Sequence, residues 1–247
     1  MKIVDVKQGS AEWLRARAGV LTASEFDNLI SPTFKRREGQ MPQTYILRKI
    51  AEQIMGLPIE QGGAWATDQG AILEGEAIPW LEFTHNLSID RVGFVTSDDG
   101  RVGCSPDGLI GEDGGVEVKC PQPVNHLRYL LEGGVPADYL LQVHGSLYVT
   151  GRKWWLFVSY SRQFPPVMVR VERDEKIIAK IDEVLMATLD EFETKLAKVR
   201  ALKVEYDGPK IAAGRERDAK EEAAARAALG GGELPGEKWL RENGRIS

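Results

Sequence analysis

The chain has 247 residues, 43% of them apolar and 28% charged, which is typical of a protein that buries a sizeable core. Its 32 basic and 37 acidic residues give a formal net charge of −5, which excludes a globally basic nucleic-acid coat but not a locally basic groove. Cys104 and Cys120 are too few for a disulfide framework, an iron–sulfur cluster or a four-cysteine zinc site.

No segment of the sequence has the pattern of a membrane span or of a secretion signal. A span needs roughly 18 consecutive apolar residues, and no run in the chain approaches that length. The first ten residues carry Lys2, Asp5 and Lys7 in place of the apolar stretch of a signal peptide. We therefore expect reduced thiols and a cytoplasmic location.

Helical spacing dominates the first third of the chain. Residues 10–18 and 22–26 predict two short helices, of which the second opens with hydroxyl and acidic side chains. Residues 42–55 and 65–83 predict two longer helices, and Pro79 should kink the second of them or mark its restart.

The pattern then changes to short apolar runs between glycine-containing turns, which predicts several strands from residue 87 to residue 119. The elements expected after these strands are helices over 125–132 and 137–150, strands over 154–160 and 167–171, and an amphipathic helix over 174–204. The order of elements predicts an α/β domain over residues 1–207, with a central mixed sheet flanked by helices.

Composition shifts after Gly208-Pro209. Residues 210–229 are rich in alanine and charge but have little apolar stripe to bury, and three glycines follow. We expect residues 208–247 to be a helical appendage and tail, packed on the body or on a neighbouring subunit.

The most informative segment holds two acids and a lysine. Asp107 lies between Pro106 and Gly108, which predicts a turn that fixes its position. Glu117 and Lys119 are separated by one residue in an apolar strand, so their side chains share one face. The three side chains are therefore expected to converge at one edge of the sheet.

This trio suits metal-assisted phosphodiester hydrolysis. Carboxylates are the hard oxygen ligands that Mg²⁺ and Mn²⁺ prefer, and a nearby ammonium can orient an attacking water. Pro-Asp, about ten residues, then Glu-x-Lys is the pattern of the PD-(D/E)xK nuclease fold, the restriction-endonuclease-like core. The alternative is an exposed turn aspartate and an ordinary Glu–Lys pair worth a few tenths of a kcal/mol.

Seven stretches, in order, make the chain resemble the YqaJ-type viral exonuclease and recombinase family, typified by phage lambda exonuclease. They span about residues 8–205 and are Gln8–Leu14, Arg17–Glu25, Gly70–Glu74, Cys104–Leu109, Glu117–Pro121, Gln142–Ser146 and Glu172–Lys176.

The resemblance implies a catalytic and metal-binding set. The implied metal ligands are Glu74, Asp107, Glu117 and the carbonyl of Val118. Lys119 matches the lysine that activates the attacking water, and Gln142 matches a glutamine that orients this group. Glu74 has an alternative reading as a solvated helix acid beside Glu76.

The resemblance also assigns Arg17, Ser24 and Ser105 to a pocket for the 5′-terminal phosphate. Arginine grips phosphate in bidentate fashion, and Ser24 lies in the first turn of a predicted helix, where free amide groups attract anions. The alternative is that Arg17 and Ser24 only satisfy the ends of two short helices.

Together these matches imply a Mg²⁺-dependent 5′→3′ exonuclease on linear double-stranded DNA, with two ions in each site and Mn²⁺ as a substitute. It would release 5′-mononucleotides and leave a 3′ single strand for recombination. The family further implies a ring-shaped homotrimer, a single-strand annealing partner protein, and a phage or prophage source in a bacterial cytoplasm.

Two other readings remain open from the sequence. One is a structure-specific or sequence-specific endonuclease of the same fold, which closed circular duplex would reveal as substrate. The other is a catalytically silent module that binds DNA or a partner, against which the intact Asp107, Glu117 and Lys119 set argues.

Overall fold

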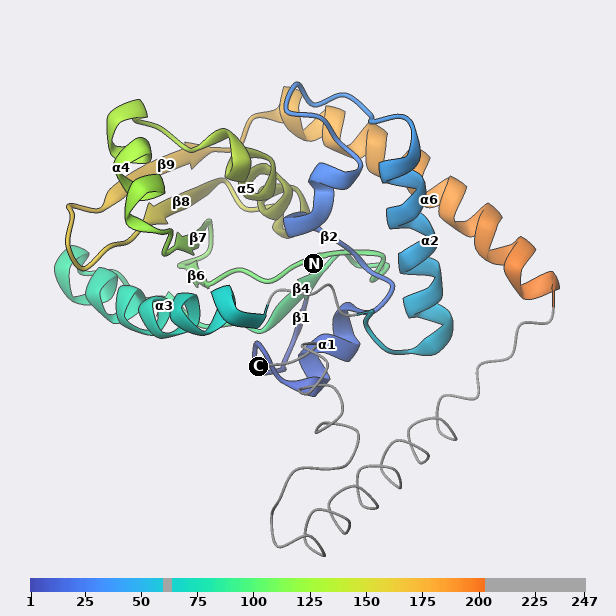
Figure 1. Cartoon of the computed structure of the whole chain (residues 1–247), viewed down its shortest axis with the longest axis horizontal. Helices are drawn as coiled ribbons and strands as arrows, with labels where there is room; N and C mark the ends of the chain where they lie inside the picture. The colour runs from blue at the N-terminus through green and yellow to red at the C-terminus, as the bar shows by residue number, and fades with distance from the viewer. Residues whose placement is uncertain (60–63, 203–247) are drawn as a thin grey trace, which may run out of the picture. The chain divides into compact units, whose positions relative to one another are not determined.

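The computed structural model describes residues 1–59 and 64–202 (Figure 1). Within these ranges the side chains of residues 64–72 and of Glu74 are not described. The expected domain boundary at residue 207 and the appendage over residues 208–247 lie outside the described residues. In the described part, no helix is long and apolar enough to cross a membrane.

Four short strands form the first sheet, in the order β1-β4-β5-β2. They are β1 (Lys2–Val4), β4 (Phe94–Thr96), β5 (Val102–Cys104) and β2 (Leu21–Thr22). β4 pairs antiparallel with both β1 and β5, whereas β2 runs parallel to β5. This sheet thus joins the N-terminal segment to the segment that leads into Asp107.

The second sheet has five strands in the order β3-β6-β7-β8-β9. They are β3 (Ile89–Asp90), β6 (Gly108–Ile110), β7 (Gly114–Lys119), β8 (Trp154–Ser159) and β9 (Val167–Glu172). β7 and β8 are parallel and the other pairs are antiparallel. This is the mixed central sheet that the sequence predicted, and β7 occupies its middle.

The predicted helices are present with small changes of bounds. They are α1 (Ala11–Arg17), the 3₁₀ helix η1 (Ala23–Asn28), α2 (Gln40–Met55), α3 (Ala64–His85), α4 (Pro123–Glu132), α5 (Ala137–Thr150) and α6 (Glu175–Ala201). Pro79 lies inside α3, which continues through it as one helix. Figure 1 shows α2 lying beside α6, with which it is in contact.

The strand alternation of β7 sorts its side chains between two layers. Val116 and Val118 pack with Ala77, Ile78 and Leu81 of α3 in one hydrophobic cluster. Glu117 and Lys119 alternate with these valines along the strand. Their side chains therefore point to the opposite face, the one that α5 covers. The spacing of Glu117 and Lys119 predicted this arrangement.

Helix α5 holds the two sheets together. It contacts β4 and β5 of the first sheet, β8 of the second, and both η1 and α6. A Cβ on Gly145 of α5 would lie 2.8 Å from the ring of Phe26 in η1, closer than real Cβ atoms approach. The glycine therefore allows η1 to lie directly against α5, and it fixes Ser24 close to the helix that carries Gln142.

Candidate active site

The Asp107 side chain crosses from the start of β6 to the neighbouring strand β7. Its backbone amide donates to the carbonyl of Val116 at 3.2 Å, and its Oδ2 accepts from the amide of Val118 at 2.6 Å. Asp107 is only 8% exposed. The carboxylate is thus held against the residue that separates Glu117 from Lys119.

Glu117 is the centre of a compact polar cluster. It is 2% exposed, and its Oε1 accepts from Gln142 Nε2 at 2.5 Å and pairs with Lys119 Nζ at 2.5 Å. Strand β7 presents the acid and the lysine, and α5 presents the glutamine from the facing layer. The structure therefore brings together four of the predicted residues: Asp107, Glu117, Lys119 and Gln142.

Lys119 is charged in this setting. Burial lowers the pKa of its ammonium, but the charge and hydrogen bond of Glu117 raise that pKa by more, and the net pKa lies above its usual value. The ammonium also lies 5.2 Å from the centre of the Tyr139 ring. A residue so placed stabilises negative charge and does not accept a proton at neutral pH.

Tyr139 is a neighbour of the site that sequence reasoning missed. It lies three residues before Gln142 on α5, so both side chains are on one helix face, as their contacts with Lys119 and Glu117 show. The i, i+3 spacing was the available signal.

The remaining predicted metal ligands are Glu74 and the carbonyl of Val118. Glu74 lies on α3, which packs against β7, but its side chain is outside the described residues. Among the described residues there is no group of three His, Cys, Asp or Glu side chains that could hold a metal ion. The described donors, two carboxylates beside a strand backbone, are all oxygen and suit Mg²⁺ or Mn²⁺.

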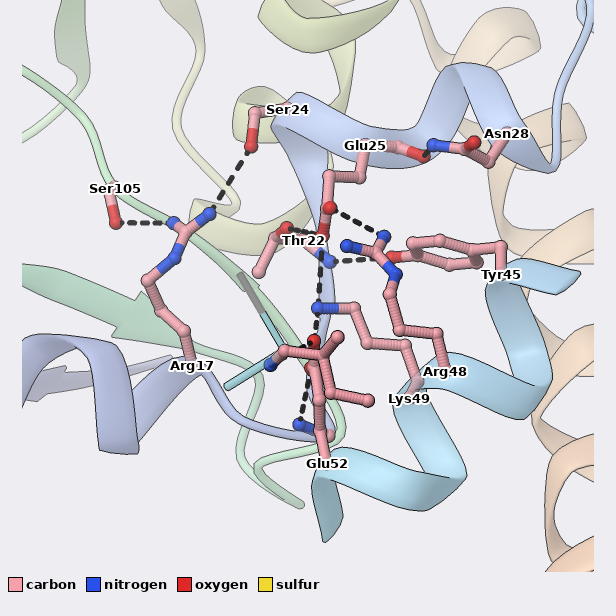
Figure 2. A network of polar contacts seen from close by, with 12 residues as sticks. Arg17, Thr22, Ser24, Glu25, Asn28, Tyr45, Arg48, Lys49, Glu52 and Ser105 are labelled. Carbon is pink, nitrogen blue, oxygen red and sulfur yellow. Dashed lines mark hydrogen bonds and ion pairs between the residues drawn. The ribbon is translucent and has the colours of Figure 1, made fainter. Parts of the chain in front are cut away.

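The three residues predicted to bind a terminal phosphate also converge (Figure 2). Arg17 Nη1 donates to Ser105 Oγ at 2.9 Å, and Arg17 Nη2 donates to Ser24 Oγ at 3.5 Å. These residues come from α1, η1 and the segment that follows β5. We call them the Arg17 pocket.

The helix-end reading fits Arg17, which lies in the last turn of α1, but it does not fit Ser24. Thr22 occupies the N-cap position of η1, and Ser24 lies inside the helix with its hydroxyl toward Arg17. The capping position at the end of α1 is Ala18, whose own amide bonds to the helix. Both predicted side chains are directed toward each other.

The positive charge of Arg17 has no acidic hydrogen-bond partner among the described residues. Burial lowers the pKa of the Arg17 guanidinium, an effect that nearby Glu25 opposes, and a guanidinium stays charged in proteins. In the described ranges, its hydrogen-bond partners are the two serine hydroxyls, and no carboxylate forms an ion pair with it. A half-buried cation with hydroxyl partners is a suitable site for an anion.

Two residues before and inside α1 support the Arg17 pocket. The indole nitrogen of Trp13 donates to Ser105 Oγ at 2.9 Å and to the carbonyl of Gly93 at 3.1 Å, and the Arg17 guanidinium lies 4.4 Å from the ring centre. Gln8 Nε2 donates to the carbonyl of Pro106 at 2.8 Å. Sequence reasoning gave neither a role, although both lie in the first of the matching stretches.

Glu25, next to Ser24, makes stability depend on acid pH. Burial raises its pKa, but Lys49 and Arg48 lower it by more, and the net pKa lies below the usual 4.5. A depressed carboxyl pKa stabilises the fold above the unfolded value and ceases to do so as pH falls through the folded value. We expect the urea midpoint of the wild type to fall between about pH 5 and pH 3.

The same urea measurement on Glu25→Gln tests whether the loss of stability in acid comes from Glu25. The variant should lose about 1–2 kcal/mol of unfolding free energy at pH 6, because charged hydrogen bonds are lost, and its midpoint should depend less on acid pH. Glu172→Gln, in an exposed pair with Arg170, is the matched control and should change little. Equal acid slopes for the wild type and Glu25→Gln would contradict the assignment.

Comparison with known proteins finds a matching family model and similar solved structures. Residues 12–153 match the model of the YqaJ-like viral recombinase domain. An alkaline exonuclease from Laribacter hongkongensis, LHK-Exo, is 27% identical with a TM-score of 0.70, over 78% of this chain and 98% of that chain. Its complex with dAMP has 29% identity, the same TM-score and the same coverage.

A phage-related exonuclease from Haemophilus somnus 129PT shares the fold at 15% identity, with a TM-score of 0.54 over 73% of this chain and 96% of that chain. No curated protein sequence matches significantly. These findings support a nuclease role and confirm the PD-(D/E)xK fold. Because the family model covers more than half of the sequence, the chain belongs to the YqaJ-like viral recombinase family.

Proposed function

We propose that the chain is a Mg²⁺-dependent 5′→3′ exonuclease that degrades one strand of linear duplex DNA and leaves a 3′ single strand. The observation that carries this proposal is the Arg17 pocket, a half-buried guanidinium on hydroxyl partners, beside the acid cluster. Such a pocket suits a terminal phosphate, which carries more charge than an internal diester.

Spacing supports mononucleotides as the product. Ser105 of the pocket and Asp107 of the acid cluster are two residues apart, a span of at most about 7 Å. Phosphates of one DNA strand rise about 3.4 Å per nucleotide along the axis, so a bound end lies near the first ester of its strand. The related LHK-Exo has been crystallised with dAMP, a nucleoside monophosphate.

The oxygen donors fit divalent metal ions. Asp107, Glu117, Glu74 and the Val118 carbonyl would hold two Mg²⁺ ions, or Mn²⁺ in their place. When bound, such ions polarise the phosphoryl oxygen and lower the pKa of water.

The protein side chains have separate parts in the proposed reaction. Lys119, charged and paired with Glu117, would orient the attacking water and stabilise negative charge on the phosphate. Gln142 holds the Glu117 carboxylate in one orientation through its amide hydrogen bond. Arg17 would hold the strand end so that the first ester stays in place.

A nuclease assay on matched substrates tests the proposal. End-labelled linear duplex with a 5′-phosphate should release mononucleotides in Mg²⁺ and nothing in EDTA. Closed circular duplex of the same sequence should remain intact. Cutting of the circle would favour an endonuclease, and binding of linear duplex without any cleavage in Mg²⁺ would favour a silent DNA-binding module.

Arg17→Ala should slow degradation of 5′-phosphorylated duplex and shrink its preference over 5′-hydroxyl ends. Loss of one charge-assisted contact costs on the order of 1.5–3 kcal/mol, roughly 10-fold to 150-fold in kcat/KM. Arg15→Ala, an exposed arginine on the same helix, is the control and should keep the preference. If Arg17→Ala keeps the wild-type ratio between the two ends, the pocket assignment fails.

We further propose a homotrimeric ring, a single-strand annealing protein as partner, and action in the cytoplasm of a bacterial host of the phage or prophage. These proposals depend on the family alone. Sedimentation velocity of the full chain measures the first, with a mass of about three chains of 27.4 kDa expected.

A further inference from the structure

A network of charged side chains, two of them buried, lies beside the Arg17 pocket (Figure 2). Lys49 of α2, with 5% of its side chain exposed, places its ammonium 3.0 Å from Glu25 Oε2 and 3.0 Å from Glu52 Oε2. Glu52 is 3% exposed. A single lysine therefore joins a carboxylate of η1 to a carboxylate of its own helix.

One carboxylate of this network holds the segment that follows Arg17. Glu52 Oε2 accepts from the backbone amide of Gly19 at 3.1 Å. Gly19 has a φ of +77°, and a Cβ there would lie 2.7 Å from Cβ of Gln53. The backbone just after α1 is thus held against α2. Because Arg17 is the last residue of α1, the position of its backbone is held as well.

The other carboxylate holds the segment that carries Ser24. Glu25 follows Ser24 directly, and its Oε2 accepts from Thr22 Oγ1 at 3.0 Å as well as from Lys49. Its Oε1 accepts from Arg48 at 2.6 Å. The first turn of η1 is therefore tied to α2 on the side away from the pocket.

Buried ion pairs are an inefficient means of stabilising a fold, because apolar residues of similar volume do as well or better. Their directional hydrogen bonds do fix the relative position of the groups that they join. In this chain the groups so joined are the two backbone segments that supply Arg17 and Ser24.

We propose that Lys49 is a positioning residue for end recognition: through Glu52 and Glu25 it sets the distance between Arg17 and Ser24, and with it the preference for a 5′-terminal phosphate. This inference rests on the proposed function of the Arg17 pocket. Lys49 itself does not reach the bound end, because its ammonium is buried between the two carboxylates.

Lys49→Met tests the role, since methionine keeps the length of the side chain without its charge. The measurement is the affinity for a linear duplex with a 5′-phosphate and for the same duplex with a 5′-hydroxyl, by fluorescence anisotropy in EDTA so that no strand is cut. We expect the ratio of the two affinities to fall about tenfold from the wild-type ratio, as misplaced binding groups lose their selective contact. A general loss of folded protein would lower both affinities together and leave the ratio unchanged.

Arg152→Met is the matched control. It removes another buried cation, whose guanidinium donates to the carbonyls of Gly111 and Gly114 at 2.7 and 2.6 Å in the β6–β7 turn. The variant should be less stable and keep the wild-type ratio. If Lys49→Met does not fold, Glu52→Gln decides the question and should also lower the ratio.

Two results overturn the inference and differ in what else they overturn. If a folded Lys49→Met keeps the wild-type ratio, the positioning role is wrong but the exonuclease proposal stands. The same holds for Glu52→Gln where Lys49→Met does not fold. A wild-type chain that binds both ends equally removes the pocket assignment and the positioning role together.

Discussion

Asp107→Asn and Glu117→Gln should each reduce Mg²⁺-dependent cleavage of linear duplex by about 10³-fold, as expected when a charge-stabilising group of a reaction centre is removed. Each amide keeps the size of the acid and one oxygen acceptor. The bond from the Val118 amide to residue 107 therefore persists, while the negative charge that attracts a divalent cation is lost. The measurement is the initial rate of nucleotide release, together with isothermal titration of Mg²⁺.

Asp113→Asn is the matched control for these variants. Asp113 is half exposed at the turn between β6 and β7, where it pairs with Lys153. Its variant should keep wild-type cleavage and Mg²⁺ binding. Near-normal rates in Asp107→Asn or Glu117→Gln, with unchanged Mg²⁺ titration, would contradict the metal-site assignment.

Lys119→Met is expected to lose about 10²-fold or more in kcat while it retains DNA binding, since a lost electrostatic or proton-handling group commonly costs this much. Its ammonium pairs with Glu117 Oε1, so its removal leaves an acid with less compensation but the metal ligands intact. Single-turnover rates at saturating Mg²⁺ separate the chemical step from binding.

Lys153→Met controls for the loss of one positive charge near the sheet. Lys153 is largely exposed in its surface pair with Asp113, and its variant should keep the wild-type rate. Full activity of Lys119→Met at saturating Mg²⁺ would remove Lys119 from the mechanism.

Much of the fold is readable from local periodicity. The helices α2, α5 and α6 and the strands β8 and β9 have six or more residues, enough to repeat an apolar pattern. Strand β1 was not predicted, because it lacks the flanking glycine-containing turns that indicated the equally short β4, β5 and β6. It forms through pairing with β4, a contact that joins Lys2 to Thr96 and that only the folded chain reveals.

The acid cluster was predictable for a different reason. Glu117 and Lys119 lie on β7, where the pleat decides which side chains share a face, and Asp107 immediately precedes β6, the other strand of the same hairpin. Trp13 and Lys49 act across sequence separations that no local pattern encodes. Trp13 bonds to Ser105, and Lys49 reaches Glu25 from another helix, so their contacts depend on how distant elements pack.

The contact of Gly145 with Phe26 has a consequence for engineering the enzyme. Glycine inside a helix is an ordinary target for stabilisation, because alanine favours the helix by about 1 kcal/mol. On α5 the added methyl group would displace η1, which carries Ser24, from the helix that carries Gln142. A design that raises thermal stability should therefore leave this glycine unchanged and place its substitutions at exposed positions of α6 that contact neither α2 nor α5.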